Sequence, residues 1–161
     1  MAYPLVRLLS VREYREHAAE SEVQASKRRV TEAQDGVRAA EKALVDFLAW
    51  RDTEEERLFG EIRRKQIAYR RLEDHLQDVR LLRAREAEFQ LRIQEAEKVR
   101  RQRETELERA RKLYSAATQA KRKIEEHRKI WRAAEVILEA VAEDHEMEEF
   151  TGKKADAGME G

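Results

Sequence analysis

The four histidines are the residues best suited to bind a metal ion or move a proton, and their spacing argues against both roles. They are His17, His75, His127 and His145. None lies four residues from another, so no His-x-x-x-His zinc pair can form on one helix face. None follows an acidic residue by three positions, which excludes the Glu-x-x-His ligand pair of di-iron helical bundles. We therefore expect all four to face solvent or to lie at the rim of a packing surface.

The serines and glycines are equally unfavourable for covalent catalysis or phosphate binding. The serines lack the Gly-x-Ser-x-Gly elbow that exposes a nucleophile, and only Gly36 and Gly60 precede Gly152, too far apart for a phosphate-binding loop. Carboxylates are abundant, but a narrow helical assembly offers no cleft to dehydrate them and shift their pKa values. We predict that the chain is not an enzyme, binds no cofactor and holds no metal ion.

The elements that carry these side chains are predicted to be helices. Of the 161 residues, 42% are charged, with 34 Lys and Arg against 34 Asp and Glu. Ala, Glu, Lys, Leu and Arg dominate, as is typical of coiled coils, whereas Asn is absent and Pro4 is the sole proline. A sheet protein needs turn residues and β-branched or aromatic strands. We therefore exclude sheet folds and expect an all-α fold.

Apolar residues recur with the alternating spacing of three and four that marks the seam of a left-handed coiled coil. In the first half a seven-residue stride runs through Val23, Val30, Val37 and Leu44. In the second half a stride runs through Leu82, Phe89, Ala96, Arg103, Ala110, Ala117, Ile124, Trp131 and Leu138. Its companion track is drawn through Ile93, Val99, Leu107, Leu113, Ala120, Ala134 and Val141. Such a narrow stripe favours two paired helices over a globular core.

Two matched seams flanking the midpoint predict a long antiparallel two-helix coiled-coil hairpin over residues 1–150. The predicted parts are helix 1 at about 5–73, a turn at about 73–79, helix 2 at about 79–149 and a disordered tail at 151–161. The turn segment is polar, and Asp74 and Asp78 could cap a helix there. Gly60 is the rival turn, but folding there leaves arms of unequal length. We expect one chain to form the hairpin as a monomer.

Charge is unevenly distributed along the second predicted helix. Residues 98–132 carry thirteen basic and five acidic side chains, whereas residues 133–150 carry seven acidic and no Lys or Arg. The basic stretch is interleaved with Glu104, Glu106 and Glu108, so we expect no nucleic-acid binding. No apolar run is long enough for a membrane span, and the opening residues lack the pattern of a secretory signal. The absence of cysteine makes a reducing cytoplasm the simplest setting.

The most unusual segment is FLAWRDTEEERLFGEIRRKQIAY, residues 47–69, where four aromatic side chains gather. Trp50 and Phe59 cannot both join Phe47 on one narrow stripe. In a thin helical protein, an off-seam Trp beside Arg51 is typical of a residue that anchors an interface. The alternative is a locally thickened seam near the turn.

This segment also carries a family resemblance. A charged helical hairpin that opens MAYPLVRLLSVREYRE and carries AWRDTEEERLFGEI before its midpoint resembles the central-stalk proteins of type III secretion systems over residues 1–150. These are the YscO group of injectisomes, related to the flagellar FliJ protein. Such proteins are similar to the coiled-coil shaft of the rotary ATPase gamma subunit.

The resemblance implies a non-enzymatic stalk in the cytoplasm, peripheral to the inner membrane at the secretion apparatus. It would link the hexameric secretion ATPase to the cytoplasmic ring of the export gate and could bind secretion chaperones. The candidate gate or chaperone contacts are Trp50, Arg51, Leu58, Phe59 and Tyr69. The candidate ATPase contacts are Glu139, Glu143 and Glu146, together with the opening segment 5–15. Two alternatives stay open: a generic coiled-coil scaffold and a helical nucleic-acid-binding protein.

Overall fold

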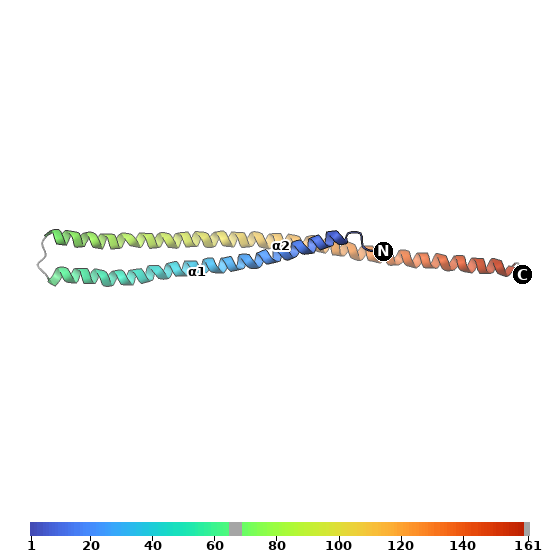
Figure 1. The fold of residues 1–161 in the computed structure, drawn as a ribbon, viewed down its shortest axis with the longest axis horizontal. Helices are drawn as coiled ribbons and strands as arrows, with labels where there is room; N and C mark the ends of the chain where they lie inside the picture. The colour runs from blue at the N-terminus through green and yellow to red at the C-terminus, as the bar shows by residue number, and fades with distance from the viewer. Residues whose placement is uncertain (65–68, 160–161) are drawn as a thin grey trace. The chain divides into compact units, whose positions relative to one another are not determined.

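The protein consists of two long helices in a computed structural model that describes residues 1–64 and 69–159. Helix α1 spans Val6–Arg64 and helix α2 spans Tyr69–Met159 (Figure 1). The described residues contain no strand, and the two helices pack against each other. The predicted all-α helical hairpin is therefore confirmed.

The contacts divide the chain into two compact units. Unit 1 comprises Met1–Ser21 and Arg111–Gly161, and unit 2 comprises Glu22–Ala110. Each unit thus takes one segment from α1 and one from α2, and helix-to-helix packing is the source of cohesion in both.

In unit 2 the helices are antiparallel, because contact partners descend along α2 as they ascend along α1. Phe47 stacks on Phe89, with ring centroids 4.6 Å apart. One turn further along α1, Arg51 binds Glu86 at 2.6 Å. The next turn brings Glu55 to Arg83, at 3.1 Å. The side chains protected on α1 keep the spacing of three and four, as in Val23, Ser26, Val30, Ala33, Val37, Ala40, Leu44, Phe47, Arg51, Glu54 and Leu58.

In unit 1 the start of the chain packs against α2. The Tyr3 hydroxyl lies 2.7 Å from His127 Nδ1, and its ring meets Trp131 edge-on at 5.4 Å. The following residue, Pro4, suits a helix start because its fixed φ is helical and its missing N–H is not needed there. Val6 N–H then donates to the Tyr3 carbonyl at 3.4 Å. Further along, Lys121 binds Glu16 at 2.9 Å, which repeats the antiparallel order.

The turn predicted at 73–79 is wrong, because α1 already ends at Arg64 and α2 already begins at Tyr69. Residues 73–79 continue the seam, with His75 half-buried and Val79 buried. They contain neither Gly nor Pro, and their packing keeps the segment helical. Gly60, the rival turn, lies inside α1. Residues 65–68, which fall within predicted helix 1, lie outside the described residues.

The predicted disordered tail is helical over its described part, since α2 continues to Met159. The Thr151 hydroxyl donates to the Met147 and Glu148 carbonyls at 3.0 and 2.9 Å. Every described side chain of this segment is exposed. Gly152 and Gly158 weaken a helix without forcing it to end. The prediction of disorder was based on the lack of an apolar stripe, which does not prevent this segment from being helical. Residues 160 and 161 of the tail lie outside the described residues.

The companion track predicted along α2 is also corrected. Val99, Leu113 and Val141 are exposed. The seam keeps Ile93 and Leu107 from that track and completes a strict interval of seven with the polar or amphipathic residues Arg100, Tyr114 and Lys121. A left-handed supercoil holds the seven-residue interval, so the seam accepts polar side chains rather than shift to neighbouring apolar ones. Leu138, the last residue of the predicted stride, is 63% exposed and outside the seam.

Candidate functional site

Phe47 and Trp50 of α1 and Phe89 of α2 form one packed aromatic cluster. Phe47 is buried and stacks on Phe89 at an interplanar angle of 18°. The guanidinium groups of Arg85 and Arg92 lie 5.7 Å from the Phe47 ring and 5.0 Å from the Phe89 ring. Trp50 touches this cluster from the side, 6.0 Å from Phe47, and stays 48% exposed. The cluster therefore fixes the position of a half-exposed tryptophan.

Arg51 is a seam residue, not a free surface cation. Its side chain is 18% exposed and binds Glu86 at 2.6 Å, with Asp52 at 3.5 Å. Although desolvation opposes its charge, the Glu86 hydrogen bond and the neighbouring carboxylates raise the pKa of Arg51 above its ordinary value. One turn along, the Arg57 hydrogen bond lowers the pKa of Glu54. A charged pair within an apolar seam sets the register of two helices.

The remaining predicted residues of this segment separate onto different faces. Leu58 is buried in the seam, whereas Phe59 is 36% exposed and Tyr69 is 78% exposed. Trp50 and Phe59 are nine residues apart, which places them about 180° apart around α1 at about 100° per residue. The structure brings Trp50 to the Phe47 cluster, pairs Arg51 with Glu86, and does not join Trp50 to Phe59. Trp50 and Phe59 therefore belong to two separate surfaces of α1.

Phe59 borders a shallow acidic groove on α1. The groove is lined by Asp52, Thr53, Glu55, Glu56 and Phe59. Glu55 is already engaged by Arg83 at 3.1 Å. Asp52 and Glu56 are exposed and lie about two turns and one turn, respectively, before Phe59. This arrangement can accept a cation that also contacts the aromatic ring.

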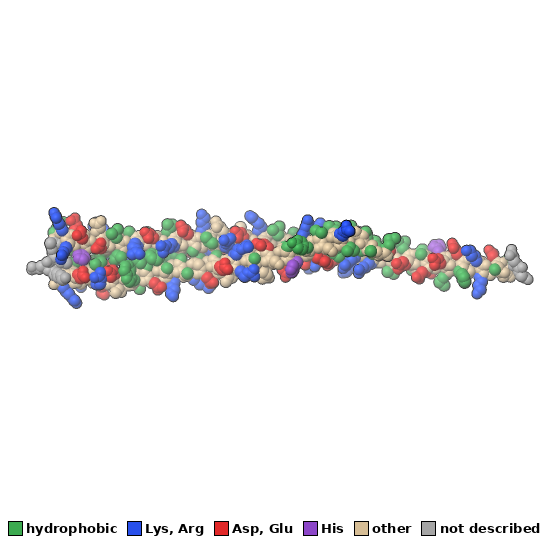
Figure 2. Space-filling view, viewed as in Figure 1, with side chains coloured by type: hydrophobic (Ala, Val, Ile, Leu, Met, Phe, Trp, Pro, Cys, Tyr) green, Lys and Arg blue, Asp and Glu red, His purple; other side chains and the backbone are tan. Residues whose placement is uncertain are grey.

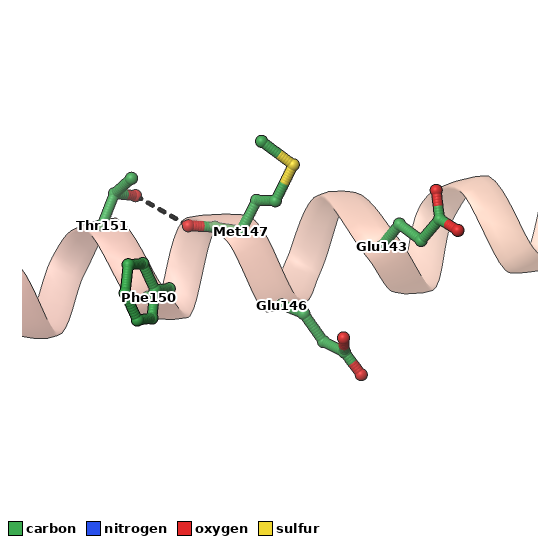
Figure 3. A pocket seen from close by; sticks show the side chains of 5 residues that line it. All are labelled: Glu143, Glu146, Met147, Phe150 and Thr151. Carbon is green, nitrogen blue, oxygen red and sulfur yellow. Dashed lines mark hydrogen bonds between the residues drawn. The ribbon is translucent and has the colours of Figure 1, made fainter.

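The three glutamates predicted as a second site lie on a part of α2 with no described helix against it. Glu139, Glu143 and Glu146 are exposed, as is every described side chain from Val136 onward. Acidic and hydrophobic side chains share this end of α2 in Figure 2. Figure 3 shows Glu143 and Glu146 beside Met147 and Phe150, all on one helix. The two glutamates and both apolar side chains line an open groove together with Thr151.

Sequence reasoning missed the apolar residues of this segment. Met147 is 67% exposed and Phe150 is 71% exposed. They share a face with Val136 and Ala140, since these four positions fall within an arc of about 80° at about 100° per residue. The signal that could have found them is this spacing of four, seven and three. It was hidden because the stripe is displaced around the helix from the seam that ends near Trp131.

The opening segment, residues 5–15, is held to α2 on one side and exposed on the other. Leu9 is buried, whereas Val6, Val11 and Tyr14 are exposed. Near its end Glu16 binds Lys121, and this hydrogen bond raises the pKa of Lys121 against the opposing effect of desolvation. The exposed side chains can therefore meet a partner without disturbing the helix pair.

The basic stretch of α2 is partly neutralised by its own glutamates. Arg100 binds Glu104 at 3.2 Å, and Arg103 binds Glu106 at 3.0 Å. Across residues 1–64 and 69–159, no group of His, Asp and Glu is arranged to hold a metal ion. Within the same ranges, no helix is long and apolar enough to cross a membrane.

Comparison with known proteins shows what the chain is similar to. The model of the family described as type III secretion protein YscO matches residues 5–153. The crystal structure of the type III secretion protein YscO from Vibrio parahaemolyticus is similar, with a TM-score of 0.81 and 30% sequence identity. The match covers 89% of this chain and 91% of the other. No curated protein matches the sequence.

Proposed function

The chain belongs to the YscO family of type III secretion proteins, and we propose that it acts as the non-enzymatic central stalk of the secretion apparatus. In this role it links the hexameric secretion ATPase to the cytoplasmic ring of the export gate, and it meets secretion chaperones from the same position. The observation that carries the proposal is the separation of exposed surfaces from a seam held by internal contacts. Such a protein can be gripped at two places without losing its fold.

The gate or chaperone contact is assigned to unit 2, at the exposed side chains of Trp50, Phe59 and Tyr69. The buried Leu58 and the half-buried Arg51 support this site by packing. Aromatic residues at a protein surface are frequent binding hot spots because they remove a large apolar area from water. Since Trp50 and Phe59 lie on different faces, each meets a different part of the partner.

The gate assignment is tested by pull-down of the export-gate ring with single and paired alanine variants of Trp50 and Phe59. Each single variant should weaken capture, and the pair should abolish it with unchanged helicity by circular dichroism. The matched control replaces Leu91 and Leu113, two exposed leucines of α2, and should leave capture intact. Full capture by the Trp50 and Phe59 pair would remove the assignment.

The ATPase contact is assigned to unit 1, at the exposed side of residues 5–15 and at Glu139, Glu143 and Glu146. The acidic stretch 133–150 favours a basic surface on the ATPase. Reversing the three glutamates to Lys should reduce stimulation of ATP hydrolysis by the purified chain, most strongly at low salt.

The matched control for charge reversal uses three exposed glutamates elsewhere, Glu41, Glu73 and Glu88. Their reversal changes the net charge equally and should preserve stimulation. Equal loss in both triple variants would mean that the effect follows net charge alone. Unchanged stimulation in the Glu139, Glu143 and Glu146 variant would contradict the ATPase assignment.

A further inference from the structure

The C-terminal segment of α2, residues 136–150, has the features of a helix that lacks its packing partner. The N-terminal residue Tyr3 packs on Trp131, and from Val136 onward every described side chain is exposed. Val136, Met147 and Phe150 are each more than 60% exposed although they are large and apolar. Scattered exposed apolar residues are ordinary, but here they align on one face.

We propose that this face of residues 136–150, called the apolar stripe, binds an amphipathic helix whose own apolar stripe is flanked by Lys and Arg. The stripe consists of Val136, Ala140, Met147 and Phe150, with Glu143 between its two halves. Because helices pack through stripes of this width, the geometry fits a helix laid along α2. Met147 and Phe150 would enter its side, and the open groove between them accepts one of its apolar side chains (Figure 3).

The charges around the apolar stripe determine which partner fits. Residues 133–150 carry seven acidic side chains and no Lys or Arg. This charge repels anionic lipid and nucleic-acid phosphate. It also opposes pairing with the same segment of a second copy, which would set seven carboxylates against seven. A protein helix with basic flanks is the remaining class that gains from both the apolar and the acidic surface.

The placement of the acidic groups supports the same occupant. Glu139 and Glu146 border one side of the stripe, and Asp144 borders the other, at about 100° per residue. Two acidic rims on either side of an apolar centre complement a helix with two basic rims. Acidic residues near a helix C-terminus also oppose the helix dipole, so a basic partner relieves an unfavourable local interaction.

This inference rests on the proposed function only for the idea that the secretion ATPase could supply the partner helix. The stripe itself is tested with the full-length chain and two synthetic helical peptides, one built from Leu and Lys and one from Leu and Glu. Fluorescence anisotropy should show binding of the Lys peptide, weakened at high salt, and no binding of the Glu peptide. Equal affinity for the two peptides would overturn the proposal.

The contribution of the apolar stripe is measured with the double variant Met147→Ser and Phe150→Ser. Affinity for the Lys peptide should fall by about tenfold or more, because both side chains lose the burial that binding provides. The matched control is Leu113→Ser with Leu138→Ser, which removes two leucines of similar exposure that lie off the stripe. The control should bind as the unaltered chain does. Equal affinity of the stripe variant would overturn the proposal.

Hydrogen exchange then locates the bound peptide. Amide protection should rise over residues 136–150 on addition of the Lys peptide, because a packed helix opens less often. Protection elsewhere with none in this segment would refute the site. A sedimentation mass of two chains that returns to one in the Met147 and Phe150 variant would identify a second copy as the occupant and likewise refute the proposal. A variant that loses peptide binding but still stimulates the ATPase would contradict only the proposed function's use of this stripe. A variant that binds the peptide but no longer stimulates the ATPase would leave this inference intact, so the two proposals can be distinguished.

Discussion

The stack of Phe47 on Phe89 provides the sharpest energetic test of how the two helices pair. Phe47 is 7% exposed, and the rings lie 4.6 Å apart at 18°. Truncating a buried Phe to Ala removes about 3–5 kcal/mol of stability in a full core. In a seam only two helices thick, we expect about 3 kcal/mol for Phe47→Ala. The stacked geometry predicts a further coupling of about 0.5–1.5 kcal/mol between the two rings.

A double-mutant cycle isolates this coupling. Phe47→Ala, Phe89→Ala and the double variant are unfolded in urea, and the free energies of unfolding are measured by far-ultraviolet circular dichroism. The contact of Arg85 with Phe47 is absent from both variants that lack Phe47, so to first order it cancels in the cycle. The control cycle pairs Phe47 with Leu107, a buried seam residue of α2 eighteen positions beyond Phe89. That control pair should be additive.

Additivity of Phe47→Ala and Phe89→Ala within about 0.3 kcal/mol would contradict the stacking of the two rings. It would mean that the two rings do not meet in solution and that the register of unit 2 is different. Coupling in the Leu107 cycle of the same size would show that the measured energy reflects general loss of stability.

Three further predictions concern the seam and the helix interior. Gly60→Ala should raise the free energy of unfolding by about 0.5–1 kcal/mol in urea denaturation, since an added methyl group meets nothing within 4 Å; a decrease would contradict the open helical site. Tyr3→Phe should lower the free energy of unfolding by about 0.5–1.5 kcal/mol through loss of the hydrogen bond to His127. No change would show that this hydrogen bond contributes nothing to stability. The raised pKa of Lys121 means that its pairing with Glu16 stabilises the fold at neutral pH and is lost as the pH rises through that pKa. The stability gap between the unaltered chain and Glu16→Gln should therefore close above about pH 10, and a gap that stays constant would refute the pairing.

The fold class could be predicted because an apolar spacing of three and four survives in both halves of the chain. Val23 and Phe47 in α1 and Leu82 and Phe89 in α2 are all protected in the structure. The connection could not be placed, because neither Gly nor Pro marks the segment between Arg64 and Tyr69. The matched lengths of the two seams indicate the position of the connection less accurately than a turn residue would.

Polar seam positions explain why the detailed register was missed. Arg51, Glu86 and Arg100 occupy seam positions although their side chains are charged. A seam assigned from apolar residues alone therefore includes neighbours such as Val99 and Leu113, which are exposed. Only the pairing of the helices, which brings Arg51 to Glu86 at 2.6 Å, makes a charge acceptable there.

The exposure of the candidate site residues follows from the sequence only in part. The exposure of Trp50 and Tyr69 suits their proposed role, whereas Leu58 is buried in the seam. The opposite placement of Trp50 and Phe59 follows from their separation of nine residues. The number of aromatic residues in the segment does not indicate which face of the helix each one occupies. Met147 was missed because the apolar stripe it belongs to is displaced from the seam and surrounded by glutamates.

The most direct test of the account is a distance measurement within unit 2 between spin labels at Glu41 and Glu95. Both side chains are exposed, and the chain has no native cysteine to compete for the label. The register of Phe47 with Phe89 places these positions at the same level of two helices, whose axes in such pairs are about 8–10 Å apart. A short distance that persists when labelled chains are diluted in excess unlabelled chain is the predicted result. A turn near residue 76 would add about 24 Å of axial offset, and a short distance lost on dilution would mean pairing between chains; either outcome would contradict the account.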